Sequence, residues 1–97
     1  MNAQRDPESA EFEHLAVACH LPGARILEIG CGQGQLTWQY AGLPRQVIGI
    51  DPSSSALHEA RSTQPARLSN VFLTQARAES LPFPSHAFDI FLFASSF

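Results

Sequence analysis

The 97-residue chain has few basic residues, no long apolar segment and only two cysteines. Its six Lys and Arg positions form no basic run and its net charge is −3, so composition does not favour nucleic acid or an anionic membrane surface as a partner. No apolar stretch approaches the roughly 20 residues that span a bilayer. The first residues lack the apolar core of a secretory signal, and we therefore expect a cytoplasmic protein.

Cysteine and histidine, which are common metal ligands, are dispersed along the chain. Cys19 and Cys31 form neither a CxxC pair nor part of a ligand cluster, and no two of the four histidines are spaced as a ligand pair. We therefore expect no metal site, and we expect both thiols to stay reduced.

Apolar residues make up 44% of the chain and charged residues 15%, as in an ordinary globular protein. Short apolar segments alternate with segments of helical periodicity, which indicates a parallel α/β sheet joined by right-handed crossovers. The expected strands are 25–29, 46–50, 71–74 and 88–93. The expected helices are 7–20, 35–41 and 55–63, and a loop over 76–85 is expected to hold a helical turn near 78–80.

The last expected strand, 88–93, is nearly all apolar, as is typical of a strand buried on both faces of a sheet. The sequence ends at Phe97, shortly after this strand, and no following helix is present to cover the strand's second face. We therefore interpret the chain as the N-terminal part of a longer domain, truncated after its fourth strand. Self-association through the exposed sheet edge is expected.

The most informative segment, 26–34, joins a short apolar run to glycines at three alternate positions. Glycine lets the backbone approach a ligand closely, and a strand that enters such a loop before a helix forms a nucleotide-binding crossover. A dinucleotide fingerprint, G-x-G-x-x-G, would need glycine in place of Gln35. That spacing counts against an NAD-dependent oxidoreductase, which we keep as an alternative function. A phosphate loop that ends in lysine is excluded because the chain contains no lysine.

An acid, Glu28, stands two residues before the first of these glycines. A carboxylate here suits a ligand with positive charge, such as S-adenosylmethionine with its ammonium and sulfonium groups. The segment resembles the first motif of class I S-adenosylmethionine-dependent methyltransferases, an acid and one further residue before G-x-G-x-G. The matching positions are Glu28, Gly30, Gly32 and Gly34. The resemblance implies that this loop, Cys31 included, lies against the amino-acid end of the cofactor and that Glu28 reaches its amino group. A loop that only marks a tight turn is the alternative.

Asp51 ends the second expected strand and precedes Pro52. Neighbouring parallel strands end at the same edge of a sheet, so this carboxylate is expected to face the glycines, where it can accept hydrogen bonds from both hydroxyls of a ribose. The family's second motif has an acid at this point. The resemblance implies that Asp51 binds the ribose and that Pro52 lies against the adenine ring. The alternative is that Asp51 is the N-cap of the next helix.

The loop after the third expected strand resembles the adenine-contacting loop of one branch of these enzymes, G-D-A-E-x-L-P-F. The matching positions are Ala78, Glu79, Leu81, Pro82 and Phe83. The usual glycine and aspartate are replaced by Ala76 and Arg77. In the family the aspartate accepts a hydrogen bond from the adenine amino group, whereas arginine only donates. Either the backbone at Arg77 and Ala78 reads the adenine edge, or Glu79 accepts the amino group. The alternative is a solvated turn whose apolar residues fill the core.

The three motifs occur in the family's order within residues 23–97, after an expected N-terminal helix in 1–22. The resemblance implies a Rossmann-like class I methyltransferase fold, with a parallel sheet that has helices on both faces. It also implies transfer of a methyl group from S-adenosylmethionine to a small-molecule acceptor, such as a lipid-quinone precursor, and it identifies no catalytic residue. An inactive truncated fragment or an interaction module is the non-enzymatic alternative.

Overall fold

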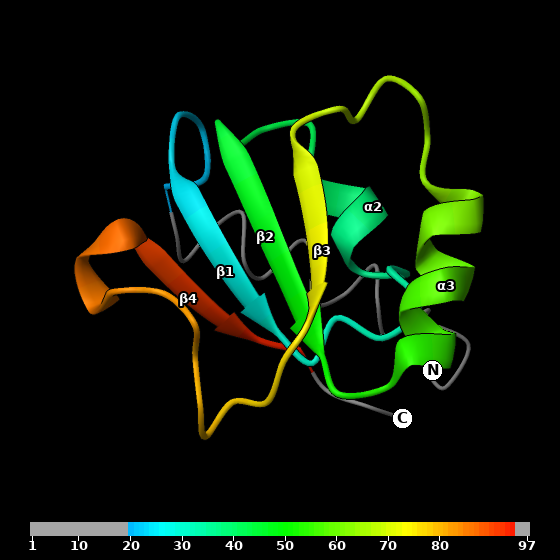
Figure 1. The fold of residues 1–97 in the computed structure, drawn as a ribbon. Coiled ribbons are helices and arrows are strands. Elements are labelled where there is room, and N and C mark those ends of the chain that lie inside the picture. Colours follow the sequence, from blue (N-terminus) through cyan, green and yellow to red (C-terminus); the bar gives the residue numbers. More distant parts are fainter. Residues whose placement is uncertain (1–19, 95–97) are drawn as a thin grey trace, which may run out of the picture.

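The computed structural model describes residues 20–94, so the expected helix over 7–20 lies outside the described residues except for His20, which is not helical. Four parallel strands form one sheet in the spatial order β3-β2-β1-β4, an arrangement that can be followed in Figure 1. The strands are β1 (Arg25–Ile29), β2 (Gln46–Asp51), β3 (Val71–Gln75) and β4 (Ile90–Phe93). The helices are α2 (Thr37–Tyr40), α3 (Ser54–Thr63) and the 3-10 helix η2 (Ser85–Ala87).

A hydrophobic core fills the space between the sheet and α2. Side chains alternate between the two faces along a strand, so Ile26, Val47 and Val71, which are adjacent in register, share one face. These three residues belong to one buried cluster with Tyr40 of α2. Figure 1 shows α2 and α3 on the same side of the sheet, as two right-handed crossovers in the same direction require.

The opposite face carries the connection from β3 to β4, which includes η2. Leu27 of β1 faces a small cavity there that is also lined by Leu81, Phe83 and Phe88 of this connection. The rings of Phe83 and Phe88 meet edge to face, with 5.4 Å between their centroids. Phe72 of β3 lies on the same face and is exposed. The β3–β4 connection therefore covers this face only in part.

Strand β4 is not buried on both faces, contrary to the expectation from its composition. Leu92 points toward the core and is buried, whereas Phe91 and Phe93 are 39% and 74% exposed. The reason is positional: β4 is an edge strand, and within residues 20–94 only the β3–β4 connection packs on its second face. Self-association through this edge stays a prediction.

Three local expectations were also wrong. Helix α2 begins at Thr37 rather than at 35, and β4 begins at Ile90 rather than at 88. The segment near 78–80 is a turn, in which the Ser80 amide donates to the Arg77 carbonyl at 3.1 Å, and it is not helical. The other described strands and α3 agree with the expected bounds to within one residue.

Candidate cofactor site

The carboxyl ends of β1, β2 and β3 meet at one edge of the sheet, where Figure 1 shows their three arrowheads converging. Ligands of open α/β sheets bind at this edge. The glycine loop (residues 30–34) follows β1, Asp51 ends β2 and Gln75 ends β3. Asp51 and Gln75 are partners in the β2–β3 register. The structure thus brings the first two sequence motifs together.

The glycine loop takes its shape from positive φ angles at alternate residues. Gly30, Gly32 and Gly34 have φ values of +80°, +56° and +85°. Residues with a Cβ rarely adopt this conformation, which explains why glycine occupies every second position. The amides of Gly30 and Cys31 both donate to the Ile50 carbonyl, at 2.9 and 3.0 Å, and so anchor the loop to β2.

Asp51 connects the end of β2 to the middle of this loop. Its Oδ2 accepts from the Gly32 amide at 3.0 Å, and its Oδ1 accepts from the Ser53 amide at 2.9 Å. A carboxylate offers about four acceptor directions, so about two remain for hydroxyl donors of a ligand. The N-cap of α3 is Ser53, whose Oγ accepts from the Ala56 amide. The alternative that Asp51 caps this helix is therefore wrong.

A hollow of about 270 Å³ lies beside Pro52 and Gln75, which are the chain neighbour and the register partner of Asp51. Its lining residues are Pro52, Gln75, Ala76 and Arg77. The side-chain amide of Gln75 donates through Nε2 to the Pro52 carbonyl at 3.0 Å. The Ala76 amide donates to the Asp51 carbonyl at 3.2 Å, which joins the two sides of the hollow. Pro52, which the motif implies lies against the adenine, therefore lines this hollow together with Gln75, a residue that the sequence analysis did not single out.

Ala78 and Glu79 are less closely associated with this site. Both are exposed and lie in the turn that follows Arg77, and neither lines the hollow next to Asp51. The structure therefore brings Ala76 and Arg77, at the start of the third motif, to the hollow and leaves Ala78 and Glu79 outside its lining.

Glu28 has no exposed surface and points toward α2. Its Oε1 accepts hydrogen bonds from the Tyr40 hydroxyl at 2.6 Å and from the Thr37 hydroxyl at 2.8 Å. Burial raises the pKa of Tyr40, and the neighbouring Glu28 carboxylate raises it further, so this hydroxyl stays protonated and donates. These hydrogen bonds connect β1, which precedes the glycine loop, to α2, which follows it. The signal in the sequence is the pair of hydroxyl residues three positions apart on one face of a short helix.

Cys31 packs its side chain onto β2 and is buried. A Cβ placed on Gly49 would lie only 3.0 Å from the Cys31 sulfur, so the absence of a side chain at Gly49 makes room for the thiol. Burial, with a smaller contribution from Glu28 and Asp51, raises the pKa of this thiol to about 12. Only the backbone of Cys31 is therefore available to a ligand at the loop.

This pKa predicts that Cys31 is unreactive toward thiol reagents in the folded protein. With a pKa of about 12, only about one molecule in ten thousand carries the thiolate at pH 8, against about a quarter for an ordinary cysteine. Ellman's reagent, applied to a Cys19→Ser variant, is expected to react at least about a hundredfold more slowly before unfolding than after it. Equal rates would show that the thiol is accessible and ionised.

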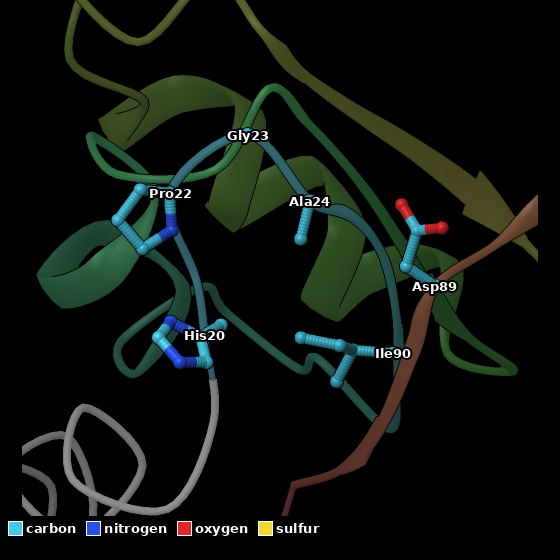
Figure 2. Close-up of a pocket in the computed structure, with 6 residues that line it drawn as sticks. All are labelled: His20, Pro22, Gly23, Ala24, Asp89 and Ile90. Carbon is cyan, nitrogen blue, oxygen red and sulfur yellow. The ribbon is translucent and has the colours of Figure 1, made fainter.

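A second hollow, of about 420 Å³, lies at the amino ends of β1 and β4, and Figure 2 shows the residues that line it. Its lining residues are His20, Pro22, Gly23, Ala24, Asp89 and Ile90. Figure 2 places His20 and Asp89 on different sides of it. Asp89 accepts from the Arg25 amide at 2.9 Å and pairs with the Arg25 guanidinium at 3.4 Å; these hydrogen bonds lower the pKa of Asp89. Asp89 thus connects the start of β4 to the start of β1, away from the glycine loop.

Residues 20–94 contain no group of His, Cys, Asp and Glu side chains arranged to hold a metal ion. Within the same residues, no helix is long and apolar enough to cross a membrane.

Comparisons with known proteins agree with this architecture. A family model described as "methyltransferase domain" matches residues 26–97. An uncharacterized methyltransferase of Bacillus subtilis, YcgJ, is 37% identical over 67 residues, which cover 68% of this chain and 26% of the relative. A ubiquinone biosynthesis O-methyltransferase of Rhizobium johnstonii is 35% identical over 91 residues, which cover 94% of this chain and 34% of the relative.

Solved structures give the same result. The crystal structure of Bacillus subtilis YcgJ superposes with a TM-score of 0.80 at 29% identity, covering 88% of this chain and 37% of that one. An S-adenosylmethionine-dependent methyltransferase of Mesorhizobium loti superposes with a TM-score of 0.71 at 28% identity, covering 87% and 39%. The chain thus spans about a quarter to a third of the curated relatives described above. Given the family match over residues 26–97, the glycine loop and the β3-β2-β1-β4 sheet, the chain belongs to the class I methyltransferase domain family.

Proposed function

We propose that this chain forms the S-adenosylmethionine-binding part of a methyltransferase that acts on a small-molecule acceptor. The observation that carries the proposal is the Asp51 carboxylate, which is fixed to the glycine loop by the Gly32 amide and keeps acceptor capacity for a ribose. Family membership supports the choice of cofactor. The name of the Rhizobium johnstonii relative, a ubiquinone biosynthesis O-methyltransferase, supports a small-molecule acceptor.

The described residues fit the proposed cofactor in three consecutive parts. The backbone of the glycine loop, Cys31 included, is the proposed cradle for the methionine end, because a Cβ at Gly32 would meet no atom within 4 Å and a ligand can therefore approach the backbone there. Asp51 is the proposed ribose acceptor. The hollow lined by Pro52 is the proposed place of the adenine, and Ala78 and Glu79 lie in the exposed turn that follows its lining residue Arg77. Glu28 is proposed to act indirectly, by holding the loop between β1 and α2 in shape.

Bound S-adenosylmethionine supplies an activated methyl group on its sulfonium. The contribution of this chain is then to align the methyl carbon with an acceptor and to exclude water. The preformed loop and the Asp51 carboxylate make that alignment rigid, because both are held by hydrogen bonds that exist without a ligand. We assign no catalytic residue within residues 20–94.

Replacement of Asp51 by alanine tests the proposal. The variant loses the ribose acceptor and the Gly32 contact, so affinity for S-adenosylhomocysteine, measured by calorimetry, is expected to fall at least about tenfold, or about 1.4 kcal/mol. Asp89→Ala is the matched control, since Asp89 also accepts from a backbone amide but lies at the other end of the sheet.

The control is expected to bind within about twofold of the unmodified protein. Unchanged affinity of Asp51→Ala would refute the ribose role. An unmodified protein that binds no S-adenosylhomocysteine would favour the alternative of an interaction module. Binding of NAD in its place would favour the oxidoreductase alternative.

A further inference from the structure

The adenine end of the proposed site lacks the acid that the family pattern places there. Arg77 occupies that position, and its guanidinium donates hydrogen bonds but accepts none. Adenine presents an amino group, which needs an acceptor, beside a ring nitrogen, which needs a donor. Glu79 is exposed and does not line the hollow. Among the residues that line the hollow, Gln75 is the one whose side chain carries an acceptor.

Gln75 has both the position and the chemistry for this role. It is the last residue of β3, pairs in register with Asp51 and lines the hollow directly. Its Nε2 donates to the Pro52 carbonyl at 3.0 Å. Because that carbonyl can only accept, the contact fixes which end of the amide faces Pro52. The Oε1 acceptor and the second N–H of Nε2 are then available on the same side chain.

We propose that Gln75 reads the adenine edge of the cofactor in this chain, in place of the aspartate that Arg77 replaces. The amide offers an acceptor to the adenine amino group beside a donor to the adjacent ring nitrogen, which is the pairing that glutamine makes with adenine elsewhere. Fixation by the Pro52 carbonyl lowers the entropy that is lost when the pair forms. The inference rests on the proposed cofactor and extends it to a specificity-determining residue.

The test compares two ligands, S-adenosylhomocysteine and S-inosylhomocysteine. The second carries a carbonyl oxygen in place of the amino group, so the Oε1 acceptor of Gln75 would face another acceptor instead of a donor. The unmodified protein is expected to bind the adenine form about 10- to 100-fold more tightly by calorimetry. Gln75→Leu is expected to reduce that ratio to within about threefold, mainly by weakening the adenine form.

Two further variants make the outcome specific. Gln64→Leu is the matched control, because the Gln64 amide also donates to backbone carbonyls but lies at the amino end of β3; its ligand ratio is expected to stay unchanged. Arg77→Asp, added to Gln75→Leu, supplies the acceptor of the family pattern and is expected to restore preference for the adenine form. If leucine disturbs the folding of β3, Gln75→Met gives the same comparison with a more flexible side chain.

Each outcome decides between the two proposals. If Gln75→Leu keeps the full ligand preference, the role of Gln75 is overturned and the proposed function stands. The same conclusion follows if the unmodified protein binds both ligands equally. An unmodified protein that binds neither ligand overturns the proposed function and this inference with it.

Discussion

Replacement of Gly34 by alanine is expected to cost about 2–4 kcal/mol of folding free energy and to weaken S-adenosylhomocysteine binding at least about tenfold. Two physical costs add at this position. The φ angle of +85° is unfavourable for a residue with a Cβ. The new Cβ would also lie 2.6 Å from an indole carbon of Trp38, so the ring or the loop must move. Because the loop is the proposed cradle of the cofactor, its displacement affects binding as well as stability.

Chemical denaturation and calorimetric titration measure the two effects. Gly23→Ala is the matched control: its φ is +79°, no atom lies within 4 Å of the added Cβ, and the residue is outside the glycine loop. It is expected to lose only the backbone cost, about 1–2 kcal/mol, and no affinity. Equal losses of stability in the two variants would show that the Trp38 contact makes no contribution, and normal binding by Gly34→Ala would show that the loop does not hold the ligand.

Replacement of Glu28 by alanine is expected to cost about 3–5 kcal/mol. Glu28 is wholly buried and is the acceptor for two buried hydroxyls, those of Tyr40 and Thr37. Its removal leaves both donors without this acceptor, at about 1–3 kcal/mol each, and creates a cavity under α2. The expected loss of stability is thus much larger than the loss on replacing a surface carboxylate by alanine, although both substitutions remove the same chemical group.

Urea denaturation provides the measurement, and Glu59→Ala on the exposed face of α3 is the matched control, expected to stay within about 0.5 kcal/mol of the unmodified protein. Tyr40→Phe removes one of the two donors. Its loss of folding free energy is expected to lie between those of Glu28→Ala and Glu59→Ala, at about 1–3 kcal/mol. A Glu28→Ala variant as stable as the Glu59→Ala control would contradict the role assigned to the buried carboxylate.

The sequence patterns predicted the sheet well because its strands carry strong local signals. Strand β1 was predicted to the residue, since Gly23 precedes it and glycine ends it. Helix α2 was predicted too long because the spacing of apolar residues gives no information about the positive φ at Gly34. The first hydrogen bond of helical type after that residue runs from the Trp38 amide to the Gly34 carbonyl. Phe93 is exposed because β4 lies at the edge of the sheet. The position of a strand within a sheet cannot be read from its local sequence pattern.

The site was predictable where spacing along the chain determines position. The glycines follow β1 and Asp51 ends the neighbouring parallel strand β2, so their convergence is a consequence of topology. The contact between Asp51 and the Gly32 amide, and the burial of Glu28 under α2, depend on side-chain directions across the fold. Gln75 was not predicted for a similar reason. Its proposed role depends on the hydrogen bond from its side-chain amide to the Pro52 carbonyl, across the end of the sheet.

The central claim is that the glycine loop, Asp51 and the hollow beside Pro52 form one cofactor site. A crystal structure of the protein grown with S-adenosylhomocysteine tests it most directly. We expect the homocysteine end along residues 30–34, both ribose hydroxyls on the Asp51 carboxylate and the adenine in the hollow lined by Gln75. Ligand density at the amino ends of β1 and β4, in the hollow of Figure 2, would contradict the account.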